Sequence, residues 1–188
     1  MILASGSPQR RAILEQLGVD FSVVVTGVEE LTAGQPEEVA LENARRKARA
    51  AAAAGQRASS ADSKDIVLGV DTLVALDERL YGKPGDRQEA AATLAALAGR
   101  RHRVVSGLCL IDAGGERSAA AVTYVSFRPM TDAAIDWYLN TGEWQDRAGG
   151  YAIQGRGAAL VESIDGDYLN VVGLPVATLM DLLPSLIF

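Results

Sequence analysis

The chain begins with the stretch Met1-Ile-Leu-Ala-Ser-Gly-Ser-Pro-Gln-Arg-Arg-Ala-Ile-Leu-Glu-Gln-Leu-Gly18. Its first four residues are apolar, and the small residues at positions 5–8 interrupt them. Leucine and isoleucine then recur at helical spacing up to Gly18. Ser7 suits the N-cap of a helix, and Pro8 suits its first position. The stretch therefore predicts a short strand, a turn and a helix.

The same alternation of strands and helices continues along the chain. Hydrophobic patterns predict further strands at 21–25, 66–70, 73–75, 79–81, 102–111, 118–127 and 160–164. Helices are predicted at 36–54, 86–99, 131–142 and from Pro175 onward, with a surface loop at 55–65. Tight turns join some strands and helices join others, so the predicted class is α/β with a mixed sheet.

Length and composition indicate a folded globular protein. The chain has 188 residues, of which 48% are apolar and 22% charged, close to the averages of soluble domains. One hydrophobic core is normal at this length, so we expect a single domain over residues 1–188, with room for two lobes.

The only cysteine is Cys109, which excludes an intramolecular disulfide and a zinc site built from several thiolates. It lies in the alternating run Gly-Leu-Cys-Leu-Ile, a pattern typical of a buried strand. We therefore interpret Cys109 as a small core residue.

Charge and hydropathy limit the partners. No apolar run is long enough to cross a bilayer, and Met1 leads into Ile-Leu-Ala-Ser without the basic start of a signal peptide. These features predict a cytoplasmic protein without a membrane partner. The net charge of −6 argues against nonspecific binding of nucleic acid, which needs a basic surface.

Basic residues at three places could contact phosphate. Arg10 and Arg11 lie at a predicted helix start, where free backbone N–H groups attract anions. Lys83 lies in a Gly-Lys-Pro turn that could aim one ammonium group, and Lys47 lies in the second predicted helix. The alternative for each is a solvated surface charge.

Acidic residues follow two predicted strands. Glu29 and Glu30 come after one strand, and Asp71 ends another and precedes Thr72. Carboxylates brought together from different strand ends are typical ligands of a hard cation such as Mg²⁺. The alternative is an ordinary solvated acidic loop.

Two further polar residues, His102 and Gln154, have side chains that could take part in function. His102 is the only histidine, and its position at the start of an alternating strand favours a structural role over that of a catalytic base. Gln154, in Tyr-Ala-Ile-Gln-Gly, could both donate to and accept from the edge of a nucleobase.

Six segments together resemble the Maf family of nucleotide pyrophosphatases. They are Leu3-Ala-Ser-Gly-Ser-Pro-Gln-Arg10, Val70-Asp-Thr72, Gly82-Lys-Pro84, Gly99-Arg-Arg-His102, Gly149-Gly-Tyr-Ala-Ile-Gln154 and Gly166-Asp-Tyr-Leu-Asn-Val-Val-Gly-Leu-Pro175. The resemblance implies an elongated mixed α/β sheet related to that of inosine triphosphate pyrophosphatases, with two lobes around a cleft, and frequent homodimers.

The resemblance also implies roles for individual residues. It makes Asp71 the catalytic acid-base residue, and Glu30 with Asp71 the ligands of a divalent cation, Mg²⁺ or Mn²⁺. It makes the basic side chains contacts of the triphosphate. The substrate-binding residues expected on this basis are Ser7, Gln9, Arg10, Lys47, Thr72, Lys83 and Gln154.

Substrate preference follows from the same comparison. Thr72 and Gln154 are similar to the members that hydrolyse dTTP and UTP, whereas the 7-methyl-GTP members usually differ at both positions. This chain has Gln9 where the dTTP/UTP members commonly have an arginine. We therefore expect hydrolysis of dTTP and UTP, with a preference for 7-methyl-GTP or a broader specificity as the alternative.

Two alternatives from other classes remain at this stage. One is a nucleotide-binding regulator of septum formation that does not turn its ligand over. The other is a P-loop ATPase or kinase, which the sequence disfavours because it lacks the run Gly-x-x-x-x-Gly-Lys-Ser/Thr.

Overall fold

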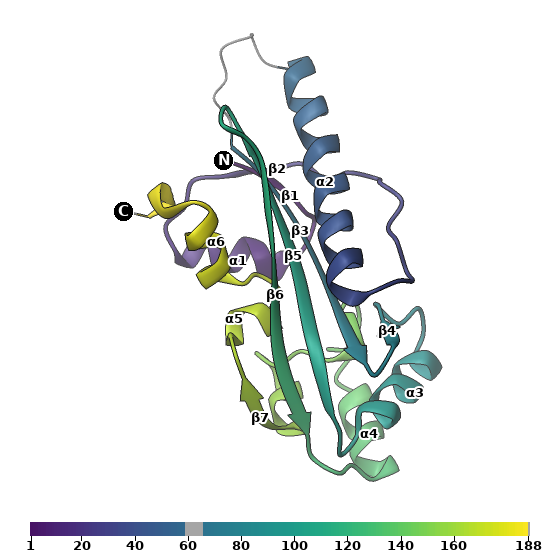
Figure 1. Ribbon diagram of the computed structural model, residues 1–188. Coiled ribbons are helices and arrows are strands. Elements are labelled where there is room, and N and C mark those ends of the chain that lie inside the picture. The colour runs from purple at the N-terminus through teal and green to yellow at the C-terminus, as the bar shows by residue number, and fades with distance from the viewer. Residues whose placement is uncertain (59–65, 188) are drawn as a thin grey trace. The chain divides into compact units, whose positions relative to one another are not determined.

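The computed structural model describes residues 1–58 and 66–187. Its strands are β1 (Ile2–Ala4), β2 (Ser22–Val23), β3 (Val67–Leu76), β4 (Arg79–Tyr81), β5 (Arg101–Asp112), β6 (Gly115–Phe127) and β7 (Val161–Asp165). Its α-helices are α1 (Pro8–Gln16), α2 (Pro36–Ala58), α3 (Arg87–Leu97), α4 (Asp132–Leu139), α5 (Tyr168–Val172) and α6 (Val176–Leu182). Figure 1 shows these elements.

The strands form one seven-stranded sheet in the order β2-β1-β3-β5-β6-β7, with β4 paired to β3. β1 pairs in parallel with both β2 and β3, whereas the pairs β3–β4 and β6–β7 are antiparallel. The predicted α/β class with a mixed sheet is therefore confirmed.

The chain divides into two compact units, which are described separately below. The first unit comprises Met1–Asp71, Ser106–Ala121 and Gly173–Phe188, and the second comprises Thr72–Val105 and Val122–Val172. Strands β3, β5 and β6 contribute residues to both units. The assignment of residues 1–188 to a single domain stays a prediction.

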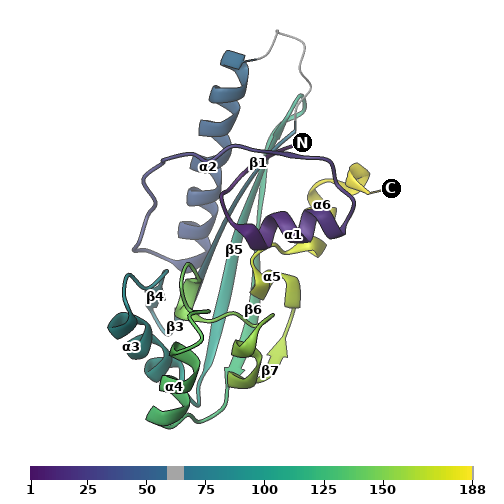
Figure 2. The same ribbon diagram turned by 180° about the vertical axis from the view of Figure 1, so that it is seen from behind.

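In the first unit, α2 packs unusually closely on its strands. Figures 1 and 2 show α2 on one side of these strands and α1 on the other, with α6 beside α1. Glycines permit the close approach: a Cβ on Gly69 would lie 2.2 Å from the Ala44 carbonyl oxygen, and one on Gly107 would lie 2.2 Å from that of Ala40. Most of the buried side chains of α2 are correspondingly small, since they include Ala40, Ala44, Ala48 and Ala51.

Cys109 belongs to this helix-on-strand layer. It is fully buried on β5, in a cluster with alanines of β1 and α2 and with Val67. Burial raises the pKa of its thiol to about 11, so the group stays protonated at neutral pH. The predicted core role is confirmed.

The second unit has a core built from leucine, valine and aromatic side chains around Phe127 and Tyr138. Two of its helices, α3 and α4, begin at capping side chains. The carboxylate of Asp86 accepts a hydrogen bond from the Glu89 N–H at 2.8 Å, and the Thr131 hydroxyl accepts one from the Ala134 N–H at 3.2 Å. The side chain of Glu89 accepts from the Gly85 N–H instead of returning to Asp86.

The structure corrects two element boundaries and adds one helix. β3 is one ten-residue strand that continues through Asp71, where two shorter pieces had been predicted, because its residues are buried on both sides of that position. α2 extends to Ala58, and the rest of the loop predicted at 55–65 lies outside the described residues. The short helix α5 had not been predicted.

Candidate active site

Three segments of the first unit meet at the side chain of Lys47. The first is α2 itself, the second is the loop that carries Glu30, and the third is strand β3 at Asp71. The Lys47 Nζ lies 2.7 Å from Glu30 Oε1 and 2.6 Å from Asp71 Oδ1. The carboxylates of Glu30 and Asp71, 41 positions apart in the numbering of the chain, therefore share one ammonium group.

The two carboxylates have different environments. The side chain of Asp71 is 10% exposed and that of Lys47 12% exposed, whereas the side chain of Glu30 is 50% exposed. Asp71 lies within the buried strand β3, and Glu30 lies on the loop before α2. The arrangement thus has a fixed buried carboxylate and a second one that reaches water.

Arg10 adds a second positive charge close to this group. Its guanidinium is buried, with Nε donating to the Gly173 carbonyl at 2.9 Å and Nη1 donating to the Ser5 hydroxyl at 2.7 Å. Burial lowers the pKa of Arg10, and the charges of Asp71 and Glu30 act in the opposite direction. Arginine stays protonated in proteins, so Arg10 is a permanent cation here.

Two polar residues at this site were missed by sequence analysis. Asn43 is 2% exposed, and its Nδ2 donates to Asp71 Oδ2 at 3.0 Å. Ser5 is also buried and accepts from Arg10. The signal for Asn43 was its spacing of four residues from Lys47, which places both on one face of α2.

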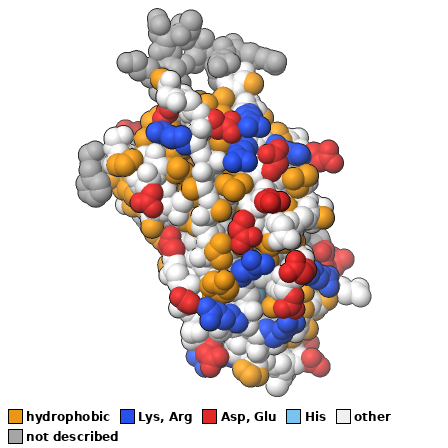
Figure 3. Space-filling model, in the orientation of Figure 1, with side chains coloured by type: hydrophobic (Ala, Val, Ile, Leu, Met, Phe, Trp, Pro, Cys, Tyr) orange, Lys and Arg blue, Asp and Glu red, His pale blue; other side chains and the backbone are white. Residues whose placement is uncertain are grey.

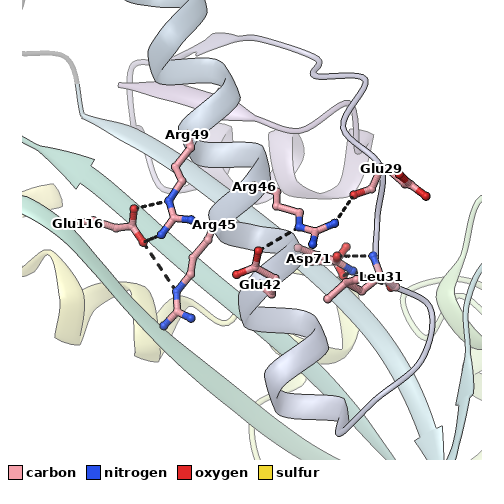
Figure 4. Close-up of polar contacts among 9 residues, drawn as sticks. Glu29, Leu31, Glu42, Arg45, Arg46, Arg49, Asp71 and Glu116 are labelled. Carbon is pink, nitrogen blue, oxygen red and sulfur yellow. Dashed lines mark hydrogen bonds and ion pairs between the residues drawn. The ribbon is translucent and has the colours of Figure 1, made fainter.

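The loop carrying Glu30 is tied to α2 on both sides of that residue. Arg46 Nη1 donates to the carbonyl oxygen of Glu29 at 3.0 Å, and its Nε donates to Glu42 at 3.0 Å. On the other side, the backbone of Leu31 bonds to Asn43. Figure 4 shows Arg46, Glu42, Glu29, Leu31 and Asp71 gathered beside the helix.

The remaining arginines of this helix face elsewhere. Arg49 donates twice to the carboxylate of Glu116, at 2.8 and 2.9 Å, and Arg45 donates to the Ser118 hydroxyl. Figure 4 shows Arg45 and Arg49 on the side of the helix away from Asp71. In Figure 3, basic and acidic side chains alternate over the part of the surface that α2 occupies. Arg45 and Arg49 thus bind the start of β6 to α2.

The carboxylates of Glu30 and Asp71 fit a hard divalent cation that binds together with a phosphate-bearing molecule. Within residues 1–58 and 66–187, no three His, Cys, Asp or Glu side chains form a group that could hold a metal ion. Mg²⁺ is usually held by one or two carboxylates, with waters and substrate phosphates completing its shell. Two carboxylates that meet the same ammonium group satisfy that requirement.

The other expected substrate contacts are distributed over both units. In the first unit, the Ser7 hydroxyl donates to Gln9 Oε1 at 3.0 Å, so that the two side chains bond to each other just where α1 begins. Thr72, Lys83 and Gln154 belong to the second unit. Lys83 and Gln154 are exposed, and Thr72 is half-buried directly after Asp71.

Hydrogen bonds to the side chains of Tyr138 and Glu143 hold the turn that carries Gln154. The Ala152 N–H donates to the Tyr138 hydroxyl at 2.9 Å, and the Glu143 carboxylate accepts from the Arg156 N–H at 2.7 Å. A Cβ on Gly157 would lie 2.5 Å from the Ala152 carbonyl oxygen, so the chain closes tightly on itself. Gln154 is thus an exposed amide on a fixed turn.

His102 has a structural environment, as expected. It is 1% exposed, its Nε2 lies 3.0 Å from the Tyr151 hydroxyl, and its ring packs edge-on against Phe127. Burial lowers the pKa of His102 from 6.5 to about 4. The ring is therefore neutral at physiological pH.

The histidine makes stability depend on pH. Below pH 6.5 the unfolded chain takes up a proton at His102 that the folded protein accepts only near pH 4, so acidification favours unfolding. We expect the free energy of unfolding of the wild type to fall by ~3 kcal/mol between pH 7 and pH 4, relative to His102→Gln. Urea unfolding of both proteins across this range checks it, and parallel curves would contradict the expectation.

The described helices offer no membrane span: none combines the length and the apolar character that crossing requires.

Comparison with known proteins places this chain in a family. The model of the Maf-like protein family matches residues 1–186. The chain belongs to the Maf-like protein family. This assignment confirms the expected family, and the match includes every segment on which that expectation rested.

Several similar proteins bear the name dTTP/UTP pyrophosphatase. The one from Deinococcus radiodurans is 45% identical over 184 residues, covering 97% of this chain and 91% of that protein. Those from Symbiobacterium thermophilum and Thermococcus onnurineus are 46% and 47% identical, each covering 94% of this chain and 88% and 92% of the relative. This Maf-like chain thus spans nearly the whole length of these relatives.

A solved structure, that of the Staphylococcus aureus Ham1 protein, is similar at a TM-score of 0.42 and 17% identity, covering 67% of this chain and 70% of that one.

Proposed function

We propose that this Maf-like chain is a nucleoside triphosphate pyrophosphatase that hydrolyses dTTP and UTP to the monophosphate and pyrophosphate with the help of a divalent metal. The names of the relatives support this activity. The observation that carries it is the convergence of Glu30 and Asp71 on Lys47, beside the buried cation of Arg10.

The chemistry requires many charges to be balanced at once. A nucleoside triphosphate carries close to four negative charges, which repel an anionic nucleophile. Mg²⁺ or Mn²⁺, held by Glu30 and Asp71, would neutralise part of this charge when bound. The proposed contacts of the phosphate oxygens are Arg10, Lys47 and Lys83. Arg10 and Lys47 are held by hydrogen bonds, and preorganised charge of this kind makes a large contribution to catalysis.

Asp71 is the proposed base of the reaction. Its carboxylate is buried and is oriented by two donors, Lys47 and Asn43. A carboxylate in this position can orient a water molecule and take its proton as the water attacks the α-phosphorus. The bond between the α-phosphorus and the bridging oxygen then breaks, and pyrophosphate leaves.

Thr72 and Gln154 are the proposed readers of the pyrimidine base, together with Gln9. The amide of Gln154 has both a donor and an acceptor to offer a base edge. We further propose that the protein acts in the cytoplasm as a homodimer. Size-exclusion chromatography with light scattering tests the dimer directly.

A panel of triphosphates tests the function. The purified protein is incubated with dTTP, UTP, GTP and 7-methyl-GTP in Mg²⁺ or Mn²⁺, with EDTA as the control. We expect equal amounts of monophosphate and pyrophosphate from dTTP and UTP, and no reaction in EDTA. Tight nucleotide binding without turnover would identify a binding protein, and release of orthophosphate alone would contradict cleavage between the α and β phosphates.

Gln9 offers a test of specificity. Gln9→Arg introduces at this position the residue that the dTTP/UTP members commonly have. We expect the ratio of kcat/KM for dTTP over GTP to rise about tenfold, the effect of one charge-assisted hydrogen bond. Gln9→Ala is the control, since it removes the amide without adding a charge. An unchanged ratio in Gln9→Arg would show that this position does not read the base.

A further inference from the structure

We propose that Asn43 is a positioning residue that holds both proposed metal ligands in register with α2. This inference rests on the proposed function, and it adds a residue to which no role had been given. Asn43 lies on the face of α2 that also carries Arg46 and Lys47, three and four positions further along the helix.

The amide of Asn43 makes three hydrogen bonds from a buried position. Its Oδ1 accepts from the Leu31 N–H at 2.7 Å, and its Nδ2 donates to the Leu31 carbonyl at 3.0 Å and to Asp71 Oδ2 at 3.0 Å. Both N–H donors of the amide are therefore used. Rotating the amide by half a turn would place its oxygen against the Asp71 carboxylate, so this orientation is the favoured one.

The pairing with Leu31 fixes the loop next to Glu30. Because Arg46 binds the carbonyl of Glu29 on the other side, the backbone of Glu30 is held to α2 at both of its neighbours. The half-exposed side chain of Glu30 is positioned by these two anchors, Asn43 and Arg46, and by its ion pair with Lys47. Of the two anchors, Asn43 is the buried one.

The third hydrogen bond of Asn43 selects the orientation of Asp71. With Oδ2 bonded to Asn43, the other oxygen, Oδ1, is the one that meets Lys47. One side chain thus sets the direction of the buried carboxylate and the distance of the exposed one from it. Residues that orient metal ligands in this way typically change metal affinity 10–100-fold when mutated.

The test compares two buried asparagines. Asn43→Ala is measured beside Asn170→Ala, since Asn170 is also buried and its Nδ2 donates to the Val104 carbonyl and the Thr123 hydroxyl within the second unit. Mn²⁺ binding is followed by electron paramagnetic resonance in the presence of a nonhydrolysable dTTP analogue, and kcat, KM and melting temperature are measured in parallel.

We expect both variants to melt at a lower temperature and only Asn43→Ala to bind Mn²⁺ more weakly, by about 10- to 100-fold. Its kcat should fall by a similar factor, with KM changed less than about threefold, because the geometry of the reacting groups is lost while the phosphate contacts stay. Asn43→Leu fills the same space without hydrogen bonds, and it replaces the alanine variant if that one does not fold.

Equal Mn²⁺ affinity in the wild type and the Asn43 variants would overturn the proposal, as would an equal loss in Asn170→Ala. The wild-type assay separates this result from a failure of the proposed function. If the wild type releases pyrophosphate from dTTP and the Asn43 variants match it, only the positioning role is wrong. If the wild type releases none, the proposed function fails first.

Discussion

Asp71→Asn is expected to bind dTTP with an affinity close to that of the wild type and to release pyrophosphate about 10²- to 10³-fold more slowly. The substitution keeps the shape of the side chain and removes its negative charge. Without that charge the side chain can neither take a proton from water nor serve as a full metal ligand. Pyrophosphate release under single-turnover conditions, with nucleotide binding measured by calorimetry, checks both parts.

A matched control separates the loss of catalysis from a general loss of charge. Asp112 is another carboxylate of the first unit, and it pairs with Arg117. Asp112→Asn should therefore keep wild-type turnover. In Asp71→Asn, the single amide oxygen can replace only one of the two carboxylate oxygens that accept from Lys47 and Asn43. The melting temperature of Asp71→Asn is therefore measured as well. Turnover near that of the wild type would remove Asp71 from the catalytic role.

Gly107→Ala is expected to reduce the free energy of unfolding by about 3 kcal/mol or more, at the upper end for overpacking of a core. The added Cβ would lie 2.2 Å from the carbonyl oxygen of Ala40 and 2.5 Å from the Leu41 nitrogen, both backbone atoms of α2. Backbone atoms cannot rotate aside as the end of a side chain can. The helix must therefore move away from β5.

The control for this substitution is Gly27→Ala, because a Cβ on Gly27 would meet nothing within 4 Å. It should change the free energy of unfolding by less than ~0.5 kcal/mol. Denaturant unfolding of the three proteins gives the comparison. Because α2 also carries Asn43 and Lys47, Gly107→Ala should lose activity under conditions in which it is still folded. Stability equal to that of Gly27→Ala would show that α2 accommodates the extra carbon easily.

Much of the fold could be predicted because its signals are local. The cap at Asp86, the cap at Thr131 and the turn at Gly114 and Gly115 between β5 and β6 each depend on residues a few positions apart. The continuity of β3 could not be predicted, since a charged residue within an apolar run is typical of a strand end. Asp71 is tolerated inside the strand because Lys47 and Asn43 bind it, and both come from a helix distant in sequence.

The candidate site, too, could be predicted only in part from the sequence. Residue types indicated which side chains could contact phosphate or a cation, and the structure joins Glu30, Lys47 and Asp71 as a group. The pattern could not show that Lys47, an expected contact of phosphate, also bonds to both carboxylates. Asn43 escaped notice for a related reason: its spacing from Lys47 indicates a shared face of α2, but it does not indicate the partners Leu31 and Asp71, which come from other segments.

The single thiol of Cys109 makes the layer beneath α2 measurable in solution. Because it is buried among the alanines of that layer and stays protonated, a thiol-specific reagent can modify it only in molecules in which the helix has lifted from the strands. The labelling rate therefore reports how often α2 opens. In the intact protein, the labelling rate of Cys109 thus measures the opening of the layer that carries Asn43 and Lys47 without an added probe.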